Sequence, residues 1–285
     1  MERIKILVDS GADIPKELVE KYDITVLPIC IIINGEVFYD GVNLDGREYL
    51  EKIKEYEQIP TTSMVPVEMM KDAFIKYSKE YDKLIYVTIS SKSSGGYQTA
   101  FLVKSQIEEE TGKDLDLTIL DSYAFSMLYG SVVVKMAKLA KNGSSYNEVI
   151  DCFNKNISNI SAYFMVGELG HLQKGGRIKP GVALIGTLLG IKPVLTINDG
   201  LVDVYSKERG KRKALDVAVK QVIAEMKNPS ESEILIANGY ADEDCKLATE
   251  MILSKITPKS IMQYDLGCVI GTHTGPGVVG ILFTK

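Results

Sequence analysis

The chain has 285 residues, of which 45% are hydrophobic and 25% charged, a composition typical of a folded protein with a substantial core. No apolar run approaches the roughly 18 residues of a membrane-spanning helix, and the formal charge of −5 argues against a dedicated nucleic-acid binder. Four scattered cysteines form neither a CxxC pair nor a zinc-ligand spacing, and the charged start does not resemble a signal peptide. We therefore expect a cytoplasmic protein with reduced thiols and no metal.

The first half of the chain alternates predicted strands with predicted helices. Apolar runs predict strands over 4–10, 24–33, 83–90 and 116–122. Helical spacing predicts helices over about 46–57 and 66–80, and Asn34-Gly35 predicts a hairpin turn. A further helix is expected between the last two of these strands, because Tyr97, Ala100, Val103 and Ile107 share one helical face. Continuous apolar strands that alternate with helices are typical of a parallel sheet covered on both faces. We therefore expect an α/β lobe over residues 1–160, with a parallel-type sheet flanked by helices.

The pattern changes after residue 160. A glycine-rich basic segment, "GHLQKGGRIKPG", leads into "VALIGTLLG", which predicts a short buried helix. Two strands joined at 198–200, a helix at about 211–226, a strand, a helix to about 256 and two final strands are then expected. Residues 161–285 should thus form a second α/β lobe, with a mixed sheet and helices.

Two loops in the first half are rich in hydroxyl groups and glycine. In "PTTSMVP" (60–66), Thr62 and Ser63 precede the helix predicted near Pro66, so they either cap this helix or face a ligand. In "TISSKSSGGYQTA" (88–100), we expect Ser94 at a helix cap, with Gly95-Gly96 allowing close backbone approach. A helix N-terminus attracts a carboxylate or phosphate, so this loop is a candidate anion site.

A third loop contains His273, one of only two histidines in the chain. It lies between Thr272 and Thr274, is followed by Gly-Pro-Gly, and is flanked by runs that resemble strands. The sequence leaves two interpretations open. The imidazole either bonds to a carbonyl in a turn between two buried strands, or points at a ligand.

The order of Ser94, an aspartate such as Asp265, and His273 also allows a lipid or ester hydrolase. In that alternative Ser94 is the nucleophile and His273 its base. The GxSxG sequence that forms a nucleophile elbow is absent, which disfavours catalysis.

Positive charge is concentrated between His171 and Lys213, a segment that contains nine basic and three acidic residues. Such a segment forms either a positive face or ordinary solvated loops and a helix start. A third class of function, nucleic-acid or regulatory binding, would use "KERGKRK" (207–213). The negative total charge makes this the weakest of the three readings.

Six motifs occur in an order and spacing that resemble the DegV family, whose bacterial members bind fatty acids. They are "ILVDSGADIP", "TTSMVP", "ISSKSSGGYQTA", "LGHLQKGGRI", "KPVL" and "GCVIGTHTGPG". The likeness runs from about residue 4 to 283. It implies a bacterial two-lobed α/β protein that holds one long-chain fatty acid, has no cofactor and is not an enzyme.

The resemblance also implies roles for particular residues. The fatty-acid carboxylate is expected to bind Thr62, Ser63, Ser94, Gly95, His273 and Thr274. A separate ATP-dependent kinase is expected to phosphorylate the carboxylate and to dock on a face that includes Arg177 and Arg209. Transient membrane contact is compatible with this role, and nucleic-acid binding is not expected.

Some positions depart from the family pattern or leave their role open. Met64-Val65-Pro66 replaces Gln-Pro-Ser, Gly96 replaces a threonine, and Glu208 precedes Arg209 where an apolar residue is usual. The acyl chain is expected to lie in an apolar tunnel. Six apolar residues either line this tunnel or belong to the core: Ile29, Ile31, Phe101, Phe164, Leu184 and Leu188.

Overall fold

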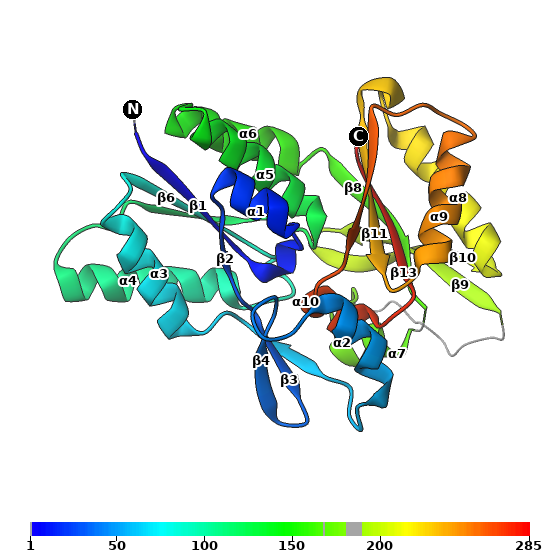
Figure 1. Cartoon of the computed structure of the whole chain (residues 1–285), viewed down its shortest axis with the longest axis horizontal. Coiled ribbons are helices and arrows are strands. Elements are labelled where there is room, and N and C mark those ends of the chain that lie inside the picture. Colours follow the sequence, from blue (N-terminus) through cyan, green and yellow to red (C-terminus); the bar gives the residue numbers. More distant parts are fainter. Residues whose placement is uncertain (1, 168, 181–189) are drawn as a thin grey trace. The chain divides into compact units, whose positions relative to one another are not determined.

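The computed structural model describes residues 2–167, 169–180 and 190–285 (Figure 1). The chain forms two compact units, each built from two pieces of sequence. Unit 1 contains Met1–Cys30 and Thr62–Ser158, and unit 2 contains Ile31–Thr61 and Asn159–Lys285. The sequence division at residue 160 corresponds to the last passage between units, but it assigned residues 31–61 to the N-terminal lobe. The structure groups this segment with unit 2, through contacts to residues more than 200 positions away that no local pattern encodes.

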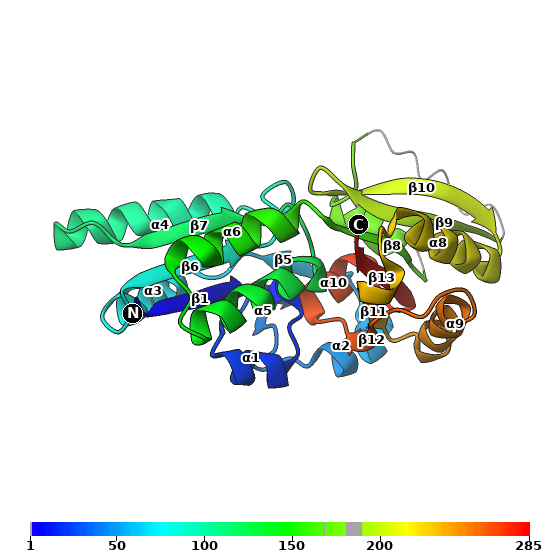
Figure 2. The same cartoon turned by 90° about the horizontal axis from the view of Figure 1, so that it is seen from above.

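Unit 1 is built on a four-stranded parallel sheet with the order β2-β1-β6-β7. The strands are β1 (Ile4–Asp9), β2 (Thr25–Leu27), β6 (Lys83–Thr88) and β7 (Leu117–Asp121). The helices are α1 (Lys16–Tyr22), α3 (Val67–Ser78), α4 (Gly96–Thr111), α5 (Met127–Lys141) and α6 (Tyr146–Ile157). Helices α3 and α4 pack on one face of the sheet, and α1, α5 and α6 on the other (Figures 1 and 2). The expected parallel sheet flanked by helices is confirmed.

Unit 2 is built on a six-stranded mixed sheet with the order β10-β9-β8-β13-β11-β12, in which only β11 and β12 are parallel neighbours. The strands are β8 (Ile160–Met165), β9 (Ile191–Asn198), β10 (Leu201–Arg209), β11 (Glu233–Gly239), β12 (Ser260–Asp265) and β13 (Val278–Thr284). The helices are α2 (Gly46–Lys52), α7 (Gly170–Gly175), α8 (Lys211–Glu225), α9 (Asp242–Leu253) and α10 (Cys268–Thr274). Apolar residues of α8 and α9 form the core against this sheet, which confirms the expected mixed sheet with helices.

A small third sheet has the order β4-β3-β5. Its strands are β3 (Cys30–Ile33), β4 (Glu36–Tyr39) and β5 (Thr61–Ser63). Asn34 and Gly35 both have positive φ, 50° and 85°, as the predicted hairpin turn requires. The single strand predicted over 24–33 is wrong, because the chain forms two strands, β2 and β3, separated by Pro28-Ile29. Proline cannot donate a hydrogen bond to a neighbouring strand, so it interrupts the ladder.

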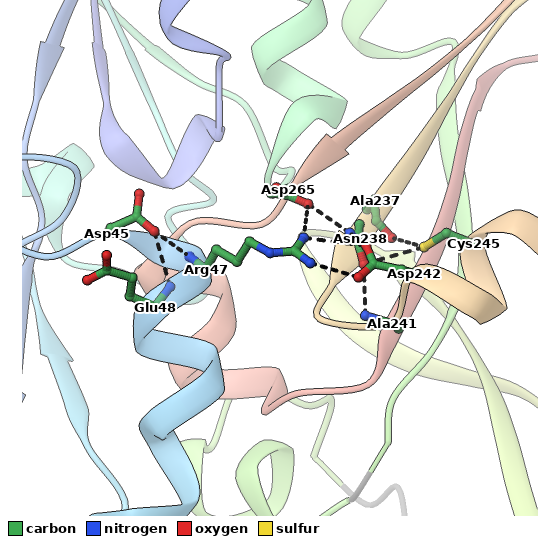
Figure 3. Close-up of polar contacts among 9 residues, drawn as sticks. All are labelled: Asp45, Arg47, Glu48, Ala237, Asn238, Ala241, Asp242, Cys245 and Asp265. Carbon is green, nitrogen blue, oxygen red and sulfur yellow. Dashed lines mark hydrogen bonds and ion pairs between the residues drawn. The ribbon is translucent and has the colours of Figure 1, made fainter.

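Helix α2 is fixed within unit 2 by a polar network (Figure 3). Arg47 forms an ion pair with Asp242 at 2.7 Å and a longer one with Asp265 at 3.6 Å. Asn238, which is 1% exposed, donates to the same two carboxylates at 2.8 Å each. The network therefore connects α2 to the ends of β11 and β12 and to the start of α9.

Two further sequence predictions concern the segments around His273 and around residues 182–190. The loop predicted around His273 is wrong, because residues 268–274 form the short helix α10. The helix predicted for "VALIGTLLG" falls on residues 182–190 and lies largely outside the described residues. Within the described part of the chain, every helix is too short or too polar to cross a bilayer.

Candidate functional site

Several polar residues at the strand ends of unit 1 have structural partners. The Asp9 carboxylate accepts hydrogen bonds from the Ile89 N–H at 2.7 Å and from the Tyr129 hydroxyl at 2.5 Å. Asp121 accepts the N–H groups of Ser91 and Tyr123 at 3.1 and 3.0 Å. These carboxylates thus hold the loops after β6 and β7 in place, and they set the backbone path from Ile89 toward Ser94.

Thr62 and Ser63 lie in strand β5, which precedes helix α3. Helix α3 begins at Val67, and its N-terminal position, Pro66, has no side-chain capping bond. Thr62 is half-buried and Ser63 is exposed. Neither residue therefore occupies the N-cap position of α3.

Ser94 and Gly95 lie immediately before helix α4. The cap position is Gly95 rather than Ser94, since α4 begins at Gly96. The Ser94 hydroxyl instead accepts the Gly96 N–H at 3.3 Å. Gly95 is exposed, and the Ser94 bond occupies one N–H group in the first turn of this 16-residue helix, a position that generally attracts anions.

Unit 1 brings these two loops together through Met64. The Thr99 hydroxyl donates to the Met64 Sδ at 3.0 Å, and a Cβ placed on Gly95 would lie 3.8 Å from the same sulfur. Thr62 and Ser63 directly precede Met64, and Ser94 and Gly95 start the helix that contains Thr99. We call these four residues, Thr62, Ser63, Ser94 and Gly95, the hydroxyl corner.

Ser94 lacks the geometry of a hydrolase nucleophile. A nucleophile elbow has a strained backbone with positive φ, and Ser94 is absent from the positive-φ residues of the described chain. The chain's two histidines both lie in unit 2. The structure therefore provides no elbow for the hydrolase alternative.

His273 lies in the last turn of α10 and is half-buried. Burial of the ring, with the nearby Arg177 charge and His171, lowers the pKa of His273 to about 4. The imidazole is thus neutral at neutral pH, with one donor and one acceptor nitrogen. The neighbouring Thr274 hydroxyl donates to the Ile270 carbonyl at 2.8 Å and is engaged inside the helix.

Two glycines make room for the two histidines. A Cβ on Gly175 would lie 2.5 Å from His273 Nδ1, and a Cβ on Gly275 would lie 2.6 Å from His171 Cδ2. Gly275 also has φ +67°, which disfavours any side chain. The segment "GHLQKGGRI" (170–178), which contains His171, and the motif His-Thr-Gly-Pro-Gly (273–277) therefore each supply the glycine that lies against the other's histidine.

Two residues that hold Thr272, the residue immediately before His273, were not predicted from the sequence. The Tyr49 hydroxyl lies 2.8 Å from Thr272 Oγ1, and His171 Nδ1 lies 3.2 Å from the Thr272 carbonyl oxygen. Tyr49 is 1% exposed, and burial raises its pKa well above the ordinary value. No sequence signal marks Tyr49, because its partner is 223 positions away.

The two expected docking residues differ in their surroundings. Arg177 is half-buried, and its guanidinium donates to the Gly175 carbonyl at 2.5 Å, close to His273. Arg209 is exposed at the far end of β10. The Arg177 carbonyl accepts the N–H of Val202 near the start of that strand, which puts the two backbones about 20 Å apart at the usual rise of a strand. Unit 2 therefore does not bring the two arginines together.

Three of the nine basic residues between His171 and Lys213 form ion pairs with carboxylates of the same chain. Ion pairs connect Lys179 with Asp203, Lys211 with Asp244, and Lys213 with Glu208. In the described ranges, no group of three or more His, Cys, Asp or Glu side chains is arranged to hold a metal ion.

The residues proposed to line the tunnel differ in how much of each residue is exposed. Ile29 and Ile31 are 5% and 0% exposed, as core residues are, whereas Phe101 is 45% exposed. Phe164 is half-buried, and Leu184 and Leu188 lie outside the described residues.

Comparison with known proteins extends over the whole chain. The DegV family model matches residues 3–285. A DegV domain-containing protein of Clostridium acetobutylicum is 33% identical over 100% of this chain and 99% of its own length. A DegV family protein of Thermus thermophilus, whose structure was described for fatty acid binding, is 28% identical with a TM-score of 0.89, covering 99% of both chains. A DegV family structure from Ruminococcus gnavus with vaccenic acid is 25% identical with a TM-score of 0.87, covering 99% of this chain and 100% of that one. The chain belongs to the DegV family.

Proposed function

We propose that this protein binds one long-chain fatty acid and presents its carboxylate to a separate ATP-dependent kinase, which forms an acyl phosphate. The observation that carries the proposal is the hydroxyl corner at the N-terminus of α4. It gathers hydroxyl groups and backbone N–H groups in one place, and it occurs in a family whose solved members include fatty acid binding proteins.

A carboxylate inside a protein is costly unless hydrogen bonds satisfy its oxygens. The hydroxyls of Thr62, Ser63 and Ser94 and the first N–H groups of α4 supply donors of the right chemistry. We include His273 as a further head-group donor, because its neutral ring retains one N–H. Binding of the anion should raise the pKa of His273 toward its ordinary range and strengthen the contact.

The acyl chain should supply most of the affinity. At about 0.8 kcal/mol per buried methylene, a sixteen-carbon chain yields roughly 10 kcal/mol before the costs of binding. This exceeds the few kcal/mol expected from head-group hydrogen bonds. The polar groups therefore fix which end of the ligand faces the kinase, and this orientation is what presentation requires.

Native mass spectrometry of the purified chain tests the binding half of the proposal. We expect a bound species whose added mass corresponds to a long-chain fatty acid and which disappears after delipidation. A delipidated protein that fails to take up palmitate or vaccenate would contradict the proposal.

The Ser94→Ala variant tests the hydroxyl corner. We expect fatty-acid affinity to fall by about ten-fold, the effect of one hydrogen bond to a charged group, while lipid remains detectable. Ser105→Ala, on the exposed side of α4, is the matched control and should bind as the wild type does. Equal affinity of the Ser94 and Ser105 variants would remove Ser94 from the head-group site. An acyl-phosphate assay with a fatty acid kinase then tests presentation separately.

A further inference from the structure

We propose that Tyr49 is a positioning residue that holds His273 in its working orientation by fixing the side chain of the preceding residue, Thr272. The inference rests on the proposed role of His273 at the fatty-acid carboxylate. It assigns a purpose to the segment 31–61, which joins unit 2 from the first part of the sequence.

The short helix α10 needs outside support. It has seven residues, and isolated helices of this length are not stable in water. Within unit 2 it packs against α2 and α7 (Figure 1). Its orientation, and therefore that of His273, depends on contacts from those two helices.

The hydrogen-bond directions around Thr272 follow from donor counting. Thr272 has one hydroxyl hydrogen, which goes to the Cys268 carbonyl at 2.7 Å. The Tyr49 O–H is therefore the donor in its 2.8 Å bond to Thr272 Oγ1. The Thr272 carbonyl can only accept, so His171 carries hydrogen on Nδ1, 3.2 Å away. Thr272 is thus held by its side chain from α2 and by its carbonyl from α7.

The same segment also holds the start of α10. Asp40 Oδ1 accepts the Cys268 N–H at 3.0 Å, and the Leu44 carbonyl accepts the Cys268 thiol at 3.5 Å. Leu50 fills the space beside Gly271, where a Cβ would meet it at 2.8 Å. Among these contacts, the Tyr49 bond is the one adjacent to His273.

The Tyr49→Phe variant removes only the donor and leaves the ring in the core. The chain has two histidines, so ¹⁵N-histidine NMR gives two sets of imidazole signals, and a His273→Ala sample assigns them. We expect the His273 signals to move in Tyr49→Phe, and the pKa of His273 to rise by about one unit as the loosened helix end admits water. Thr272→Val removes the acceptor and should reproduce the shift.

Fatty-acid affinity provides the second measurement. Tyr49→Phe should weaken binding by about five- to ten-fold, the usual effect of losing one buried hydrogen bond. In a His273→Ala background, the same substitution should change affinity by less than about two-fold, because Tyr49 acts through His273. Tyr163→Phe removes a hydroxyl bonded to Glu225 elsewhere in unit 2 and is the matched control, with unchanged His273 signals.

Two results would overturn the inference. One is a His273 signal and pKa unchanged by both Tyr49→Phe and Thr272→Val in folded protein. The other is an equal loss of affinity from Tyr49→Phe with and without His273. By contrast, normal affinity of His273→Ala alone would reject the head-group role of His273, and the NMR shift would still decide whether Tyr49 orients the ring.

Discussion

The protonation of His273 is the residue-scale property with the clearest consequence. A pKa of about 4 means that the folded protein keeps this imidazole neutral in conditions where an exposed histidine, with a pKa near 6.5, is charged. The cost of charging it arises from burial, the positive Arg177 and the second histidine. An incoming carboxylate would compensate this cost, so the ring favours an anionic ligand over a neutral one.

Stability should depend on pH through this residue. Since the folded pKa lies below the unfolded value, the contribution is fully present above about pH 6.5 and is lost as the pH falls toward 4. The slope is at most about 1.4 kcal/mol per pH unit within that window. Urea unfolding of ligand-free protein at pH 7, 6 and 5 measures it. His273→Gln should show a flatter profile between these values, and parallel profiles would indicate an ordinary histidine.

At the scale of elements, the sequence predicts what local pattern encodes. Strands β1, β6 and β7 were predicted because continuous apolar runs, such as Ile4–Asp9, are typical of strands buried on both faces. The capping box of α6 is also local, because Ser145 and Glu148 are three residues apart and both of its bonds are present. Helix α10 was missed because its apolar, glycine-flanked sequence resembles a strand, and the residue that caps its first N–H, Asp40, is 228 positions earlier.

In the candidate site, too, the sequence predicts features that a local pattern encodes and misses contacts between distant residues. The motifs located the hydroxyl corner and His273, since glycine and hydroxyl clusters stand out in a sequence. They did not reveal Tyr49 or the contact of Gly175 with His273, which depend on pairing between distant segments.

The network around Arg47 belongs to the same scale, because it attaches one helix to a sheet edge. Exposed ion pairs contribute little to global stability, so Arg47→Met should leave the melting temperature nearly unchanged. We expect faster hydrogen exchange confined to the amides of α2 and α10, measured by mass spectrometry. Lys71→Met, which breaks the exposed Lys71–Glu110 pair in unit 1, should leave those amides unaffected. Exchange that is equally slow in both variants would show that packing alone holds α2.

At the scale of the whole molecule, the basic segment is the feature that concerns a partner. Carboxylates of the same chain balance Lys179, Lys211 and Lys213, whereas Arg209 is exposed. A separation of about 20 Å between the Arg177 and Arg209 backbones fits within a protein–protein interface of ordinary size. Arg177 lies beside His273, so it has a second candidate role at the head group.

Charge reversal separates these roles. Arg209→Glu should slow association with the kinase by about ten-fold at low salt and leave fatty-acid content unchanged, since rim charges act mainly on association rates. Lys227→Glu makes the same charge change at another exposed position and should associate normally. Loss of lipid with normal kinase association would instead place Arg209 at the ligand.

The interleaving of the two units also governs how the protein is made. Asp40 leaves the ribosome 228 residues before Cys268, the group whose N–H it accepts. At a synthesis rate of about 5 to 20 residues per second, the early segment waits roughly 10 to 45 s for its counterpart. Unit 1 is complete in the nascent chain by residue 158, while the helix that bears His273 is complete only at residue 274. A truncated translation product would therefore contain the hydroxyl corner without its histidine.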